Sequence, residues 1–190
     1  MNTRYLAMLL LVVGAGGTQI GCVPAMTIDQ MREMKIVRPP EVDLLRMFAG
    51  KWESTGRARM AGLEEDLTVT GASEGTWHTD RWCLVNEDVF TLGKLGDMKA
   101  LTVWRWDGKS RVFRSHWFYN DGSTGTGKAT FDPLTKTWHY TTKGSGPWCS
   151  LKGKGTIKYL DENNVLWEWH EWDGTGLVKI MELKGSSRRK

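Results

Sequence analysis

The chain has 190 residues, of which 40% are hydrophobic and 25% are charged, and its formal net charge is +4. This size and balance fit one globular domain with a short additional segment. The modest charge comes without a basic helical stripe or a zinc-finger spacing, so the sequence does not indicate a nucleic-acid-binding protein. Eleven tryptophans are far above average usage. Because large aromatic side chains bury much apolar area each, they predict an aromatic-rich core or binding pocket.

Residues 1–21 have the layout of a secretory signal. Arg4 precedes an apolar run from Tyr5 to Val13, and small residues follow. The run is too short for a transmembrane helix. Gly21-Cys22 resembles a bacterial lipoprotein processing site, although Gln19 stands where such sites usually carry Leu. We therefore expect an exported protein that a lipid on Cys22 anchors to a membrane, facing the periplasm or the cell surface; a plain signal peptide cut nearby is the alternative.

Residues 22–40 are predicted to form a tether that ends at Pro39-Pro40. A proline pair disfavours helix before it and suits the first turn of a helix after it. Glu41 and Asp43 favour the N-terminus of that helix, because acidic side chains interact well with its dipole. The folded domain is therefore expected to start near Glu41.

A long series of strands is predicted after this helix. The helix is expected over 42–49, Gly50 ends it, and Trp52 opens the first strand. Period-2 patterns then alternate with turn signals, as in an antiparallel meander. The predicted strands are 52–60, 65–78, 81–92, 98–106, 110–119, 124–131, 135–142, 151–160, 164–172 and 176–184. Since closure removes exposed edges, we expect an all-β fold: an antiparallel up-and-down barrel of about ten strands with a short N-terminal helix, over 41–185, followed by a basic tail at 186–190.

Cys83 and Cys149 remain once Cys22 is set aside. Two cysteines in an exported protein can pair, so a disulfide between them is possible. The alternative is two buried thiols that act as small hydrophobic groups. A cysteine-based metal site is not expected, because there is no C-x-x-C and no histidine is spaced with either cysteine.

The motifs that would indicate catalysis are incomplete. The segment Gly122–Ala129 nearly matches a phosphate-binding loop, but it ends in Ala129 and lacks a following helix, so we interpret its glycines as parts of a hairpin and a thin strand. Ser115 and His116 are adjacent on a predicted strand and point to opposite faces. There is no G-x-S-x-G elbow. No catalytic residue is therefore expected.

Alternation along the strands indicates which residues share a face, although it does not say which face is inside. Several strands mix aromatic and polar residues on both faces, which favours a partly polar interior. The pocket candidates are Trp104, Trp106, Trp117, Trp138, Tyr140, Trp167 and Trp169. The polar candidates are Arg81, Arg114, His116 and His170. Aromatic walls with a few polar groups are typical of small-molecule sites.

Lysines dominate the charged residues between Lys128 and Lys158. They indicate a basic side of the barrel, which could favour an anionic ligand or an anionic membrane surface. The simpler interpretation is a solvated face whose charges also protect strand edges.

The helix at 42–49, Gly50-x-Trp52 and the uninterrupted meander together resemble calycin, or lipocalin-like, barrels. More narrowly, the domain is similar to a bacterial family of exported lipocalin-like domains that has no established function or catalytic residues. The segments that carry this resemblance, within about residues 43–185, are Phe48–Trp52, Asp80–Leu84, Thr102–Asp107 and Ser115–Trp117.

A second resemblance is to haem-binding barrels of the nitrobindin type, which open with G-x-W-x-G-x-G. Gly50, Trp52 and Gly56 match this pattern, but Ser54 replaces the middle glycine. The resemblance implies that a histidine on a C-terminal strand binds haem iron, and His170 lies in about that region.

We therefore expect a non-catalytic, lipid-anchored barrel without a cofactor that binds a small apolar or amphipathic molecule. One alternative is a haem barrel that uses His170 as the metal ligand. Another is a filled barrel that acts as a scaffold through its outer surface, and a third is a barrel enzyme.

Overall fold

The computed structural model describes residues 27–33 and 37–190. The expected signal segment 1–21 and Cys22 lie outside the described residues. Within the part that is described, no helix is long and apolar enough to cross a membrane.

The chain divides into two compact units between Val37 and Arg38. The first contains a short helix, α1 (Ile28–Glu33). Thr27 starts this helix with a capping box, in which its hydroxyl accepts from the Gln30 amide at 3.2 Å and the Gln30 side chain accepts from the Thr27 amide at 2.9 Å. The expected tether thus includes a capped helical turn.

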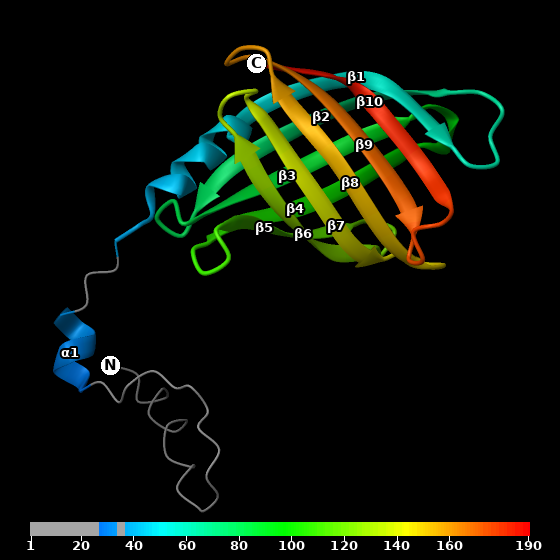
Figure 1. Cartoon of the computed structure of the whole chain (residues 1–190). Coiled ribbons are helices and arrows are strands. Elements are labelled where there is room, and N and C mark those ends of the chain that lie inside the picture. The colour runs from blue at the N-terminus through cyan, green and yellow to red at the C-terminus, as the bar shows by residue number, and fades with distance from the viewer. Residues whose placement is uncertain (1–26, 34–36) are drawn as a thin grey trace, which may run out of the picture. The chain divides into compact units, whose positions relative to one another are not determined.

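The second unit is a closed antiparallel barrel of ten strands, in which each strand pairs with the next and β1 pairs with β10 (Figure 1). The strands are β1 (Gly50–Met60), β2 (Leu67–His78), β3 (Cys83–Leu92), β4 (Asp97–Asp107), β5 (Val112–Tyr119), β6 (Thr124–Asp132), β7 (Thr137–Ser145), β8 (Ser150–Tyr159), β9 (Asn164–Asp173) and β10 (Lys179–Arg189). A short 3-10 turn, η2 (Gly93–Leu95), joins β3 to β4. The predicted fold class is confirmed, and each predicted strand is present within a few residues.

The helix before the barrel is a 3-10 helix, η1 (Pro40–Phe48), at the end of the barrel where β1 begins. We call this the closed end and the opposite end the mouth. Val42 and Leu45 of η1 are at most 1% exposed and pack with inward-facing side chains of the strands. The unit starts at Arg38, slightly before the expected Glu41, and the Arg38 guanidinium pairs with Asp43 of η1.

Three inward-facing side chains donate to the last carbonyls of η1. Tyr159 Oη donates to Met47 at 2.6 Å, Arg189 Nη2 donates to Met47 at 3.2 Å, and Asn86 Nδ2 donates to Phe48 at 3.5 Å. The final carbonyls of a helix have no partner within the helix, so these donors satisfy them. They also fix η1 to strands β8, β10 and β3.

The last strand continues to Arg189, so the predicted basic tail at 186–190 is wrong. Residues Ser186 to Arg189 pair with β1 and help to close the barrel. The Arg189 guanidinium lies 4.7 Å from the ring centroid of Trp52. A cation over an indole face is stabilising, which explains why this basic end is ordered.

The possible disulfide between Cys83 and Cys149 does not form, and both thiols are free. Cys83 begins β3 at the closed end, whereas Cys149 lies in the β7–β8 hairpin at the mouth. Bridged cysteines have Cα atoms within about 7 Å, and opposite ends of the barrel are much farther apart. The Cys83 thiol instead contacts the Thr79 hydroxyl at 3.6 Å.

Candidate functional site

The strand register assigns the predicted pocket residues to two different faces. Burial alternates along each strand, and the buried positions mark the inside of the barrel. The inward-facing candidates are Trp104, Trp106, Trp117, Trp138, Tyr140, Trp167 and Trp169. The outward-facing candidates are Arg114, His116 and His170. The predicted aromatic residues therefore face the interior, whereas these predicted polar residues do not.

Arg114 is held on the outer face by an ion pair. Its Nε lies 2.5 Å from Asp107 Oδ2, and its Nη2 donates to the Ser110 hydroxyl at 3.2 Å. The bond from Arg114 lowers the pKa of the Asp107 carboxyl to about 2, with the Ser110 amide as a second cause. Arg81 lies in the β2–β3 turn, where its guanidinium is 5.0 Å from the Trp77 ring centroid. Neither arginine lines the interior.

The closed half of the interior is a packed core rather than a binding wall. Trp138 has no exposed surface, and Phe113 is 2% exposed. Their ring centroids are 4.8 Å apart, and Phe48 of η1 lies 4.9 Å from Trp138. Trp106 adds a further ring 4.8 Å from Phe113. Trp138 therefore stabilises the fold and does not face a ligand.

Glycines on the inner face provide the space in which three of the tryptophan rings lie. A Cβ added at Gly153 would be 2.1 Å from Trp169 Cζ2, and one added at Gly155 would be 2.6 Å from Trp169 Cε3. Trp117 lies in the same way on Gly125 and Gly144, and Trp167 on Gly56 and Gly185. Because these rings lie against the wall, they line the interior without crossing it. The sequence predicted only that the glycines of β6 belong to a hairpin and a strand with little side-chain bulk. In the structure, Gly125 also leaves room for the Trp117 ring.

Some inward-facing side chains nearer the mouth are partly exposed, although Ala58, Leu67, Val69 and Leu92 form a second packed cluster at that end. Trp169 points inward and is partly exposed, as are the residues Asp88 and Glu171. Trp104 and Tyr140 are partly exposed too, but they pack against the core of the closed half, where Trp104 stacks on Phe48. Neighbouring aromatic rings connect along this wall, with centroids 6.0 Å apart for Trp104 and Tyr140 and 6.3 Å apart for Tyr140 and Trp169. We call this region the open half of the interior. It combines aromatic and polar side chains on the inner face, as the mixed strand patterns predicted.

Several buried polar atoms of the interior have no hydrogen-bond partner. They include Asn86 Oδ1, Trp117 Nε1 and the Tyr140 hydroxyl. Burial raises the pKa of the Tyr140 phenol well above its ordinary value, so it stays protonated. An unpaired buried polar group costs about 1–3 kcal/mol. A bound molecule or water that paired with these atoms would remove that cost.

Four polar residues of the open half were missed from the sequence: Asn86, Asp88, Tyr119 and Glu171. In β3, the face that carries Leu84 and Leu92 also carries Asn86 and Asp88. Polar residues that share a strand face with apolar residues are a readable signal, because period-2 alternation groups them together, but it does not decide that this shared face is the inner one. Glu171 shares its face with Trp167 and Trp169 and could have been found in the same way.

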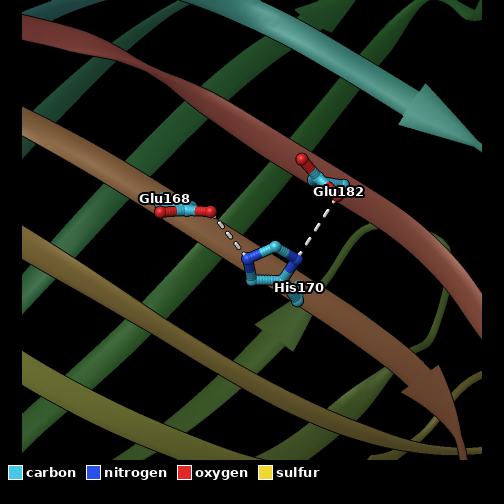
Figure 2. A group of neighbouring side chains, drawn as sticks. All are labelled: Glu168, His170 and Glu182. Carbon is cyan, nitrogen blue, oxygen red and sulfur yellow. Dashed lines mark hydrogen bonds and ion pairs between the residues drawn. The ribbon is translucent and has the colours of Figure 1, made fainter.

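His170 lies on the outer face of β9 between two carboxylates (Figure 2). Its Nε2 is 2.8 Å from Glu168 Oε1, and its Nδ1 is 3.6 Å from Glu182 Oε2. These three side chains are the group among the described residues that could hold a divalent cation. Lys179 Nζ already pairs with Glu182 at 3.1 Å, however, so one carboxylate is neutralised without a metal. The cluster is a surface network of polar contacts in which Lys179 is already paired with Glu182.

The same placement does not fit haem inside the barrel. A ligand to haem iron must point toward the macrocycle, and His170 points away from the interior, with both ring nitrogens directed at carboxylates. His116 also faces outward. His170, the histidine predicted to bind haem iron, therefore does not reach the aromatic wall inside the barrel.

Comparison with known proteins supports the fold alone. No family model and no curated protein matches this chain. The crystal structure of Rv2717c from M. tuberculosis superposes with a TM-score of 0.63 at 12% identity, covering 81% of this chain and 99% of that one. The S-type phycobiliprotein lyase CPES from Guillardia theta gives a TM-score of 0.53 at 9% identity, covering 80% and 94%. These likenesses and the closed barrel fit a lipocalin-like, or calycin, architecture.

Proposed function

We propose that this protein is a non-catalytic carrier that binds a small apolar or amphipathic molecule in the open half of its barrel. The observation that carries this proposal is the arrangement of tryptophans on inward-facing glycines, which keeps large aromatic rings against the wall. Small-molecule sites combine apolar and aromatic walls with a few polar groups. The open half has this composition, and several of its side chains are partly exposed.

Binding of a neutral, amphipathic fluorescent dye such as Nile red tests this proposal. Thr102 faces inward beside Trp117 and is partly exposed, so Thr102→Trp should fill the site. Thr126 faces outward on β6 and is exposed, so Thr126→Trp is the matched control. We expect Thr102→Trp to weaken dye binding at least about tenfold, while Thr126→Trp leaves it unchanged.

Equal dye binding by both variants, with circular dichroism showing both folded, would contradict binding inside the barrel. Dye binding by neither variant nor the unmodified protein would favour a filled scaffold. Native mass spectrometry of protein from its own host then gives the mass of the natural ligand. An adduct that Thr102→Trp abolishes would support the proposal directly.

We also propose that the protein is exported and anchored by a lipid on Cys22, and that the mouth exchanges ligand with a lipid surface. Four of the five hairpins at the mouth carry exposed apolar side chains: Leu63, Leu95, Trp148, Leu177 and Val178 are 36%, 53%, 92%, 87% and 57% exposed. Such side chains partition into the boundary of a bilayer. Support for export is the sequence pattern before Cys22.

Membrane association has two separable tests. Cys22→Ser should release the protein from the membrane fraction of its host if the lipid is the anchor. For unlipidated protein, Trp148→Ser should weaken binding to phosphatidylcholine vesicles, whereas Leu134→Ser should not. Leu134 is 93% exposed but lies in the β6–β7 hairpin at the closed end. An equal effect of both substitutions would show that the mouth has no special role.

A further inference from the structure

The outer face of β6, β7 and β8 carries lysines but almost no acidic side chains. The outward positions of these three strands hold threonines, serines, a histidine and five lysines, with Asp132 as their one carboxylate, at the closed end. We call the five lysines the lysine face: Lys128, Lys143, Lys152, Lys154 and Lys158. They belong to the basic side that the sequence indicated, and they point away from the interior of the barrel.

The strand register brings four of these lysines close together. Lys143 of β7 is directly opposite Lys152 of β8. In the next row, Lys128 and Lys154 lie on either side of Thr141. At about 4.8 Å between strands and about 7 Å between alternate residues of one strand, the four Cα atoms occupy an area of about 10 by 7 Å. Like charges directly opposite each other in a sheet are destabilising, and a Debye length of about 10 Å does not fully screen them.

Among the described residues, no carboxylate forms an ion pair with the lysine face. The described lysines that do form ion pairs all lie elsewhere: Lys51, Lys179, Lys184 and Lys190. Lys154 Nζ lies 5.3 Å from the ring centroid of Trp172. Lys152 Nζ donates to the Thr175 carbonyl at 3.3 Å. These partners are neutral, so the face keeps positive charge that an anionic partner can neutralise.

The lysine face extends to the β7–β8 hairpin at the mouth, where Trp148 is 92% exposed. Lys143 and Lys152 flank this hairpin, and its loop, residues 146–149, contains no acidic residue. The β1–β2 hairpin at the same end of the barrel differs, because residues 64–66 are all acidic. Charge is therefore distributed unevenly round the mouth, which is basic at β7–β8 and acidic at β1–β2.

We propose that the lysine face and the β7–β8 hairpin dock the barrel on an anionic lipid surface, with Trp148 in the boundary of the bilayer and the lysines near the lipid phosphates. Basic side chains are attracted to an anionic leaflet, and tryptophan is enriched where membrane meets water. The exposed indole beside the lysines favours a bilayer over a soluble polyanion, which has no apolar layer to accept it. The acidic β1–β2 hairpin is repelled, so the barrel tilts with β7–β8 toward the lipid. This inference rests on the proposed contact of the mouth with lipid, and it specifies the charge of that surface and the orientation of the barrel.

Flotation of unlipidated protein with vesicles tests the charge of the surface. The vesicles contain phosphatidylcholine alone or phosphatidylcholine with about one-third phosphatidylglycerol. We expect binding at least about tenfold tighter to the anionic vesicles, and loss of this preference at 1 M salt, where the Debye length is about 3 Å. Equal binding to both vesicle types would overturn the inference and leave the apolar contact of the mouth with lipid standing. If neither type binds, both fail.

A pair of double variants tests the position of the charge. Lys143→Gln/Lys152→Gln removes the two lysines beside Trp148, and Lys94→Gln/Lys99→Gln removes the same net charge near the mouth, but from η2 and β4. Each lysine near an anionic leaflet contributes about fivefold in affinity, so the first variant should weaken binding to anionic vesicles about 20-fold, and the second much less. Both should remain folded by circular dichroism and bind phosphatidylcholine vesicles like the unmodified protein. Equal losses in the two variants would show that net charge alone matters, and would overturn the inference.

An environment-sensitive fluorophore reports the orientation of the bound barrel. Cys149 is free and exposed in the β7–β8 hairpin, so it can be labelled in a chain that carries Cys22→Ser and Cys83→Ser. The comparison is the same label on Ala61→Cys in the β1–β2 hairpin, with Cys149→Ser added. We expect anionic vesicles to shift the emission of the label at Cys149 to the blue and to leave the other label unchanged. An equal shift at both positions would overturn the proposed tilt, and binding to heparin but not to anionic vesicles would overturn the choice of a bilayer.

Discussion

Trp52 is predicted to stabilise the barrel without taking part in binding. It is 6% exposed and belongs to the same core cluster as Val42 and Leu45 of η1. Its ring meets Tyr159 at a centroid distance of 6.3 Å and an interplanar angle of 82°. The Arg189 guanidinium covers it at 4.7 Å. Trp52→Ala therefore removes packing that joins η1 and the last strand to the first strand.

The expected loss is large relative to the stability of an ordinary domain. Truncating a buried tryptophan to alanine costs about 3–5 kcal/mol, and native domains are stable by about 5–15 kcal/mol. At about 2–4 °C per kcal/mol for a chain of this size, the melting temperature should fall by roughly 6–20 °C. The lost interaction with Arg189 is part of this effect rather than an addition to it.

Urea denaturation followed by far-ultraviolet circular dichroism measures the change without relying on the deleted fluorophore. Trp148→Ala is the control, because Trp148 is 92% exposed and exposed substitutions usually change stability by less than about 0.5 kcal/mol. A loss below about 1 kcal/mol for Trp52→Ala would refute the packing argument. Loss of dye binding at unchanged stability would instead place Trp52 in the site.

Three further changes have defined outcomes. Gly153→Ala places a Cβ 2.1 Å from Trp169 Cζ2, so it should destabilise the barrel by about 1–3 kcal/mol and weaken dye binding as the ring moves inward. Because burial raises the pKa of Glu171 to about 7, the folded state binds the extra proton, and stability is lost as the pH rises from about 4 through about 7; Glu171→Gln should reduce that loss in pH-dependent urea melts. Since Cys83 and Cys149 are free, Cys149→Ser should leave the melting temperature unchanged under both oxidising and reducing conditions.

Each of these outcomes has its own control. Gly108→Ala places a Cβ at an ordinary 3.6 Å from Trp106, so it should be nearly neutral, and a cost equal to that of Gly153→Ala would contradict the role of the inner glycines. Glu168→Gln should not alter the pH profile of stability in the way that Glu171→Gln does. A melting temperature that falls with reductant in the unmodified protein, but not in Cys149→Ser, would mean that the cysteines do pair.

Much of the architecture was predictable because its signals are local. The ten strands, their turns and the helix after Pro39-Pro40 follow from alternation, turn residues and proline geometry. The position of the cysteines was also implied, since alternate hairpins of an up-and-down barrel lie at opposite ends. Assigning a possible disulfide to Cys83 and Cys149 overlooked this consequence of the predicted strands.

The end of the chain was misread for a local reason. Residues Ser186 to Arg189 are polar and charged, a composition typical of a solvated tail. They form strand because β1 needs a partner to close the barrel, and because Arg189 finds both Trp52 and a helix carbonyl. Both partners are distant in the sequence, so no local pattern shows them.

The sequence by itself determined the closed barrel, because alternation and turn chemistry act within a few residues, and closure satisfies the remaining strand edges. Only the tertiary structure decided which face of each strand is inside, since period-2 alternation looks the same from both sides. That decision turned Arg114, His116 and His170 outward and brought Asp88 and Glu171 inward. It also placed the glycines of one strand beneath the tryptophans of another, a match between chain segments that strand register alone creates.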